Sequence, residues 1–153
     1  MANTYTQIHL HIVFAVRYRL GLIQEHFKND LYKYITSIVQ HHRHKLLAIN
    51  GMPDHVHILI GMRPHQSVSD LVREVKASSS KWINERKFSV GRFEWQEGYG
   101  VFSNSKSELS QILTYIQNQE QHHSQFSFAH EYRKMLDDMG IEFEERFTFQ
   151  DPV

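Results

Sequence analysis

Cysteine is absent from the sequence, which excludes disulfide bonds, thiolate metal sites and cysteine nucleophiles. No apolar run approaches the roughly 18 residues that a membrane-spanning helix needs, and the first residues do not form a basic and then apolar signal segment. We therefore expect a cytoplasmic protein that has no membrane partner.

A net charge is also absent, because 17 Lys and Arg residues balance 17 Asp and Glu residues. Residues 1–92 carry 13 Lys and Arg against 6 Asp and Glu, whereas residues 93–153 carry 4 against 11. Since phosphate binding needs a local cluster of cations rather than a basic total, the first part is able to form a nucleic-acid surface. An acidic part that keeps the chain soluble, or that meets the basic part of another subunit, is an equally open interpretation.

Apolar residues suffice for one core, because 41% of the 153 residues are hydrophobic, while two domains would each be small. Their spacing alternates in some segments and follows the helical period in others, with Ser67 or Ser69 as a helix cap. We expect strands in YTQIHLHIVF, KLLAI and HVHILIG, one bent or two short strands in RFEWQEGYGVFS, and helices over 25–42, 67–83, about 105–122 and about 130–139.

Turn and cap signals separate these elements. Asn50-Gly51 predicts the turn between the second and third strands, and Ser105 with Glu108 predicts a capping box at the third helix. The order β-α-β-β-α-β-α predicts an α/β fold, a ferredoxin-like (RRM-like) sandwich with an antiparallel sheet and helices on one face. One domain over 1–153 follows, and its C-terminal extension, about 124–153, contains an alternating segment with Ile141, Phe143, Phe147 and Phe149.

Two histidines stand one residue apart in GMPDHVHILI. His55 and His57 point away from Val56 and Ile58, so they belong to the sheet face that the first two helices leave open. Side chains two apart on a strand can share one metal ion, and histidine is the commonest metal ligand. The spacing alone is weak evidence, because HLH at residues 9–11 has the same pattern.

The third helix carries Tyr115 and Gln119 at i and i+4, beside its apolar stripe. A phenol and an amide in these positions face whatever the helix packs against. The alternative is a border tyrosine whose hydroxyl lies in water.

Three segments together resemble the motifs of the single-tyrosine HUH transposases, which move insertion sequences as single-stranded DNA: MPDHVHILI, WQEGYGVFS and YIQNQEQHH. The opening YTQIHLHIVFAVRYR is similar to the first strand of that family, and EYRKMLDDMGIEFEERF resembles the endings of some members. REP-associated tyrosine transposases are close relatives of the family. The resemblance selects His55 and His57, because HLH lacks a preceding Pro-Asp turn; His11 is then expected on the same sheet surface, outside the metal site.

The resemblance implies that Tyr115, on a catalytic helix over about 105–122, attacks a phosphodiester and leaves a 5′-phosphotyrosine and a free 3′-hydroxyl. It also implies that His55, His57 and the amide oxygen of Gln119 hold a divalent cation, Mg²⁺ or Mn²⁺. Two imidazoles suit manganese or a later metal better than magnesium, and zinc is the dissenting alternative.

The implied partner is single-stranded DNA with imperfect hairpins at the element's ends, in the nucleoid of a prokaryote. The family works as a homodimer, in which exchanged helices allow Tyr115 to act in trans, and the stretch from Gly98 to Ser105 is a candidate hinge. Eight cations are expected near phosphates: Arg17, Arg19, Arg73, Lys76, Lys81, Arg86, Lys87 and Arg92.

Two alternative functions stay open. One is a domesticated relative that acts on repeated extragenic palindromes of its host, and the other is a nucleic-acid-binding sandwich without catalysis, in which the histidines are structural. A two-metal site is disfavoured, because the sequence places no evident bridging carboxylate near either histidine pair.

Overall fold

Four antiparallel strands form one sheet in the order β2-β3-β1-β4. The computed structural model describes residues 3–124 and 126–144. The strands are β1 (His9–Ala15), β2 (Lys45–Met52), β3 (His55–Gly61) and β4 (Gly100–Asn104). β1 and β3, both expected from alternation, lie in the middle of the sheet and are almost entirely buried.

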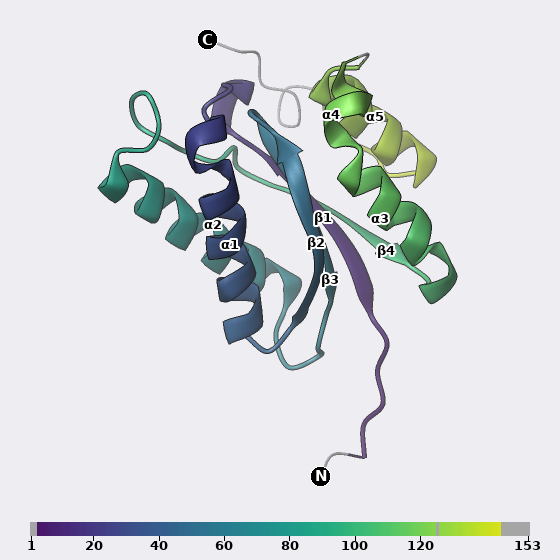
Figure 1. Ribbon diagram of the computed structural model, residues 1–153. Helices are drawn as coiled ribbons and strands as arrows, with labels where there is room; N and C mark the ends of the chain where they lie inside the picture. The colour runs from purple at the N-terminus through teal and green to yellow at the C-terminus, as the bar shows by residue number, and fades with distance from the viewer. Residues whose placement is uncertain (1–2, 125, 145–153) are drawn as a thin grey trace.

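Helices cover both faces of the sheet (Figure 1). One face carries α1 (Glu25–His41) and α2 (Val68–Arg86), and the other carries three C-terminal helices, α3 (Leu109–Gln117), α4 (Gln119–His123) and α5 (Phe128–Asp138). The predicted sandwich with an added C-terminal helix is therefore confirmed. Among the described residues, no helix combines the length and the apolarity needed to cross a bilayer.

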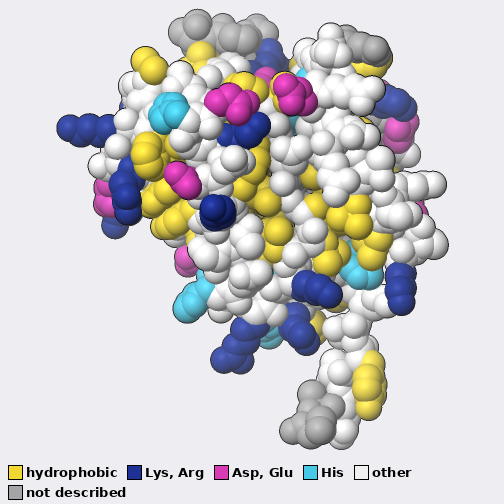
Figure 2. All heavy atoms as spheres, viewed as in Figure 1, with side chains coloured by type: hydrophobic (Ala, Val, Ile, Leu, Met, Phe, Trp, Pro, Cys, Tyr) yellow, Lys and Arg dark blue, Asp and Glu magenta, His cyan; other side chains and the backbone are white. Residues whose placement is uncertain are grey.

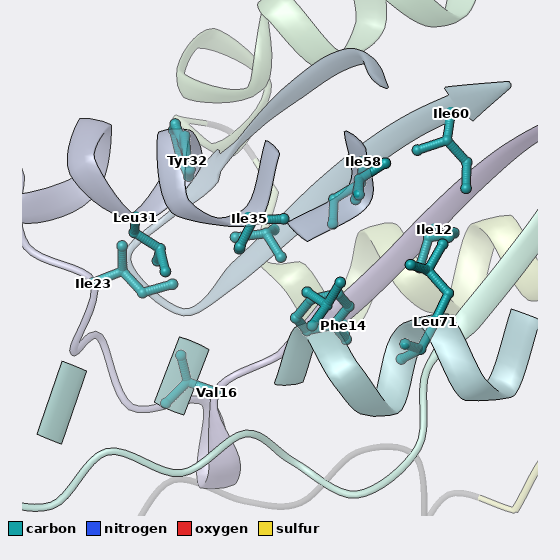
Figure 3. Close-up of a cluster of buried hydrophobic side chains, with 14 of the residues drawn as sticks. Ile12, Phe14, Val16, Ile23, Leu31, Tyr32, Ile35, Ile58, Ile60 and Leu71 are labelled. Atoms are coloured by element: carbon teal, nitrogen blue, oxygen red, sulfur yellow. The ribbon is translucent and has the colours of Figure 1, made fainter. Parts of the chain in front are cut away.

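The main core lies between the sheet and α1 and α2 (Figure 3). The alternating residues of β1 and β3 meet across the ladder, with Ile12 opposite Ile58 and Phe14 opposite Val56. Their side chains pack against apolar residues of the two helices, which repeat every three to four positions. The helix residues in this core include Leu31, Ile35, Val39, Leu71, Val72 and Val75.

A second, smaller core attaches α5 to the opposite face. Phe128, Tyr132 and Leu136 of α5 pack against Val13 and the neighbouring sheet residues Ala15 and Phe102. Because these residues recur every four positions, one stripe of α5 is buried on the sheet. This packing also sets the positions of the remaining side chains on that stripe.

The turn prediction at Asn50-Gly51 is wrong. β2 continues to Met52, and the chain turns at Pro53-Asp54. Gly51 is needed for close approach instead, because a Cβ there would lie 2.2 Å from the carbonyl oxygen of His55. Asn50 donates a side-chain hydrogen bond to the carbonyl of Ile116 (2.9 Å), which ties β2 to α3.

The expected helix over 105–122 also differs from the structure. A 3-10 turn over Lys106–Glu108 precedes α3, and the helix is interrupted at Asn118 before α4. The capping box of Ser105 and Glu108 is confirmed, as is the Ser67 cap of α2. The last helix begins at Phe128, two residues before its expected start, and Phe147 and Phe149 of the expected extended segment lie outside the described residues.

Candidate active site

His55 and His57 of β3 contact Gln119 of α4 and Glu131 of α5, so both side chains lie on the sheet face that the C-terminal helices cover, and both are fully buried. His11 of the neighbouring β1 lies on the same face, where its Nε2 is 2.8 Å from Nδ1 of His57. The strand period thus placed all three imidazoles as expected. The three C-terminal helices close this face around them.

A carboxylate lies at the centre of the cluster. Glu131 of α5 is only 2% exposed. It accepts hydrogen bonds from Nε2 of His57 (3.0 Å), Nε2 of His123 (3.0 Å) and Nε2 of Gln119 (2.9 Å). The hydroxyl of Tyr115 also donates to it. Glu131 was not among the site residues predicted from the sequence, and it is 74 residues from His57 along the chain.

In each of the three imidazoles around Glu131, the ring nitrogen Nδ1 has a partner of its own. Nδ1 of His55 lies 2.7 Å from the Asp54 carboxylate, and Nδ1 of His123 lies 2.6 Å from the carbonyl oxygen of Phe126. Nδ1 of His57 contacts His11. Metal-binding histidines show this pattern, because a partner on one ring nitrogen orients the other toward the ion.

The donor set fits a divalent cation. One ligand atom each from His55, His57, His123 and Glu131 can be chosen so that all lie within 4.8 Å of one another. Ligands at about 2.1 Å from an ion are at most about 4.2 Å apart, so a contraction of roughly half an ångström would complete the coordination. Gln119, the expected third ligand, is fully buried, and its amide oxygen is 3.0 Å from Nε2 of His55.

Burial and charge act against each other in this cluster. Burial alone would raise the pKa of Glu131, but hydrogen bonds from His123, His55 and His57 hold that pKa far below its usual range. Burial likewise opposes a charge on His55, yet the Asp54 and Glu131 carboxylates outweigh it and raise the pKa of His55 to about 9. Burial lowers the pKa of His57 to about 4. At neutral pH an imidazolium therefore faces a carboxylate beside a neutral imidazole.

Tyr115 reaches this cluster from within the same chain. Its ring centre is 5.8 Å from that of His57 and 6.3 Å from that of His11. Burial, and secondly the charge of Glu131, raise the pKa of Tyr115 well above its ordinary value, so the phenol is protonated at neutral pH. One chain thus brings together the predicted nucleophile and the histidine pair without an exchange of helices.

The family model described as transposase, IS200 like, matches residues 4–119, which include the sheet, the histidine pair and Tyr115. The chain belongs to the IS200-like transposase family. The match ends before His123 and Glu131, so α5 lies beyond the matched segment.

Several relatives match this transposase over most of its length. The ISDra2 transposase TnpA of Deinococcus radiodurans is 25% identical over 118 residues, which cover 74% of this chain and 84% of the relative. The transposase for insertion sequence element IS200 of Salmonella typhimurium is 27% identical over 124 residues, which cover 78% of this chain and 81% of the relative.

Two solved structures share the fold. A crystal structure assigned to a transposase of Deinococcus radiodurans matches with a TM-score of 0.62 at 25% identity, covering 78% of this chain and 95% of that chain. A REP-associated tyrosine transposase bound to a REP hairpin matches with a TM-score of 0.61 at 14% identity, covering 80% of this chain and 73% of that chain.

This transposase also has a groove of about 850 Å³ between α2 and residues 92–99, away from the face that holds Tyr115. Acidic residues pair with some of its cations, since Arg17 and Arg92 both contact Glu94, at 2.8 and 3.2 Å. Figure 2 shows further Lys and Arg side chains along the lower edge of the molecule, so cations are not confined to the groove. The groove is lined by five of the eight expected cations, Arg17, Arg73, Lys76, Lys81 and Arg92.

The other three expected cations are not among the lining residues of the groove. Arg19 lies in a 3-10 turn after β1, and Arg86 and Lys87 lie at the C-terminal end of α2. The sequence pattern of basic residues therefore divides into a group that the fold gathers in one groove and a group that it places elsewhere.

Two site residues could have been found from local signals. His123 follows Gln119 by four positions, the spacing of neighbours on a helix surface. Glu131 falls on the apolar stripe of α5 between Phe128 and Tyr132, where a carboxylate is costly unless it is paired. A charged residue on a buried stripe is such a signal.

Proposed function

We propose that this transposase cleaves and rejoins single-stranded DNA at hairpin-flanked ends through a 5′-phosphotyrosine intermediate. One observation supports this most strongly: the Tyr115 hydroxyl donates to the carboxylate on which His57, His123 and Gln119 converge. A DNA phosphate bound at this point would therefore contact both a nucleophile and a set of metal-ligand side chains.

Each residue has a defined role in the proposed reaction. The Tyr115 oxygen bonds to phosphorus while the bond from phosphorus to the 3′ oxygen breaks. Glu131 orients the phenol, whose proton passes to solvent water, and the departing 3′ oxygen takes a proton from solvent to become a free hydroxyl. Because the phosphotyrosine conserves the energy of the phosphodiester, a 3′-hydroxyl can reverse the attack and join a new strand without ATP.

We propose His55, His57 and Gln119 as metal ligands, and we add His123 and Glu131 to this set. A bound divalent cation would supply Lewis-acid polarisation of the phosphate and would offset the Glu131 charge, which after burial is the second cause of the raised pKa of Tyr115. The cofactor is Mg²⁺ or Mn²⁺. Three imidazoles and one carboxylate favour Mn²⁺, because magnesium prefers oxygen ligands.

The proposed DNA partner follows from a relative of known structure and from the groove beside α2. The REP-associated relative in the solved structure binds a REP hairpin, and it shares the fold of this chain. The groove beside α2 offers cations for a DNA backbone, together with the rings of Trp95 and Tyr99. We place the DNA stem there and the scissile strand at Tyr115, with the protein acting on nucleoid DNA as a homodimer.

The test is a covalent adduct. Single-stranded DNA that carries the hairpins flanking the protein's own gene is incubated with the protein and MnCl₂, and the products are run on a denaturing gel. We expect a denaturant-resistant adduct that maps to Tyr115. Tyr115→Phe should abolish the adduct and leave hairpin binding within a few-fold.

Two outcomes would contradict the proposal. Full cleavage by Tyr115→Phe would show that Tyr115 is not the nucleophile. No adduct with wild-type protein, combined with hairpin binding that EDTA leaves unchanged, would favour the binding module without catalysis.

A further inference from the structure

A cavity of about 330 Å³ lies between α3 and α5, on the same side of the sheet as the histidine cluster. Its lining includes Tyr115 and Ile112 of α3 and Glu131, Lys134 and Asp138 of α5. The cavity therefore opens directly onto the proposed nucleophile, and its volume is in the range of pockets that hold a small planar ligand.

Aromatic rings run along this cavity in contact with one another. The ring centre of Tyr115 is 5.3 Å from that of His122, which is 5.4 Å from that of Phe126. Phe126 in turn stacks on His130, with ring centres 4.8 Å apart and an interplanar angle of 11°. Although it is a large apolar side chain, Phe126 is 40% exposed. A flat π surface is thus presented beside Tyr115.

We propose that this cavity receives one unpaired nucleobase of the nucleotide next to the phosphate that Tyr115 attacks. This inference rests on the proposed function. Apolar walls do not suit the charged sugar-phosphate backbone, whereas every base has a π face that stacks on such rings. Covalent attachment to Tyr115 would hold the adjoining nucleotide within reach of the cavity.

Polar groups at the edge of the cavity could contact the edge of a base. Lys134 and Asp138, which are among its lining residues, form a solvent-exposed ion pair with 3.0 Å between ammonium and carboxylate, so a donor and an acceptor stand side by side. Base edges carry donors and acceptors in the same way, and proteins read extruded bases by such hydrogen bonds and by stacking. The cavity therefore serves to select and position the strand at the cleavage point.

The first test needs no catalysis. A single-stranded 12-mer with one 5-bromodeoxyuridine is crosslinked to wild-type protein by ultraviolet light, and the modified peptides are mapped. We expect crosslinks in the peptides that contain Phe126, His130 or Met135. Met135→Trp, which fills the cavity, should reduce them about tenfold or more, while Met139→Trp, at a half-exposed position just after α5, should leave them unchanged.

A second variant tests the same inference in case Met135→Trp fails to fold. Phe126→Ala removes a partly exposed ring from the loop before α5, and it should weaken crosslinking by roughly 5- to 150-fold, the range for loss of one stacking platform. Crosslinks that map only outside the cavity, or that neither variant changes, would overturn the inference.

A cleavage assay separates the two proposals. An abasic site next to the cleavage point should lower adduct formation by wild-type protein, but it should not lower it further in Met135→Trp. A protein that forms no adduct yet crosslinks at Phe126 would refute the proposed function and keep the cavity as a base-binding site. Normal adduct formation with no effect of the abasic site would refute the cavity alone.

Discussion

Tyr115 and Glu131 are joined by a hydrogen bond from phenol to carboxylate, although they belong to different helices and are 16 residues apart. The same carboxylate is 3.0 Å from His57 on the central strand β3. Glu131 is therefore the point at which the predicted nucleophile and the predicted metal site meet. Its role can be tested separately from DNA cleavage.

Glu131→Gln should weaken Mn²⁺ binding by at least about tenfold, because a neutral amide replaces the negative ligand among three imidazoles. Isothermal titration calorimetry with MnCl₂ measures the affinity, and electron paramagnetic resonance of Mn²⁺ reports the coordination. Glu120→Gln, on the exposed side of α4, is the matched control and should bind as wild type. Equal affinity of all three proteins would remove Glu131 from the metal site.

Inactive variants should fail to complement each other. Tyr115→Phe and His57→Ala each lack one half of the site, and the structure assembles both halves within one chain. A mixture of the two should therefore form no phosphotyrosine adduct above the level of either alone. An adduct in the mixture would show that the helix carrying Tyr115 is exchanged between subunits, as the family resemblance allows.

Lys76 should make DNA binding in the groove depend on pH. Burial lowers the pKa of Lys76 to about 8, so its ammonium is largely charged at pH 7 and largely neutral at pH 9. The slope of log affinity against log salt should fall by up to about 0.9 over this interval, the value for one phosphate contact. Fluorescence anisotropy with a labelled hairpin at several NaCl concentrations measures it.

Lys76→Arg is the control for that experiment, because the guanidinium stays charged across this pH range. Its slope should be the same at pH 7 and pH 9. A wild-type slope that does not change with pH, or one that changes equally in Lys76→Arg, would contradict a phosphate contact at Lys76.

Gly100→Ala should displace α5. A Cβ at this position of β4 would lie 2.7 Å from a ring carbon of Tyr132 and 2.8 Å from its hydroxyl oxygen. The clash should lower the free energy of unfolding by about 1–3 kcal/mol in urea denaturation and also weaken Mn²⁺ binding, since Tyr132 and Glu131 are adjacent on α5.

Two further variants test whether the clash with Tyr132 causes these effects. Gly21→Ala, where a Cβ would meet its nearest neighbour, the Cβ of Pro53, at an ordinary 3.4 Å, should change stability little. Adding Tyr132→Leu to Gly100→Ala should recover part of the lost metal binding. If the double variant binds Mn²⁺ no better than Gly100→Ala, the clash with Tyr132 is not what moves Glu131.

The misplaced turn has its origin in contacts between distant segments. Asn50 and Gly51 have turn-forming residue types, yet β2 continues through them because Gly51 permits close contact with β3, and Asn50 donates to the carbonyl of Ile116 in α3. Residue type predicts what a backbone permits. Contacts between distant segments decide which permitted conformation is used.

By itself, the sequence determined the strand faces of β1 and β3, the placement of His11, His55 and His57 on one side of the sheet, and the capping box before α3. These features follow from backbone geometry over a few residues, since alternate side chains of a strand must point the same way. Only the tertiary structure decided that Glu131 lies among the imidazoles and that five of eight cations share a groove. Both outcomes depend on how α5 and α2 pack on the sheet, and packing between residues far apart in the chain leaves little trace in local spacing.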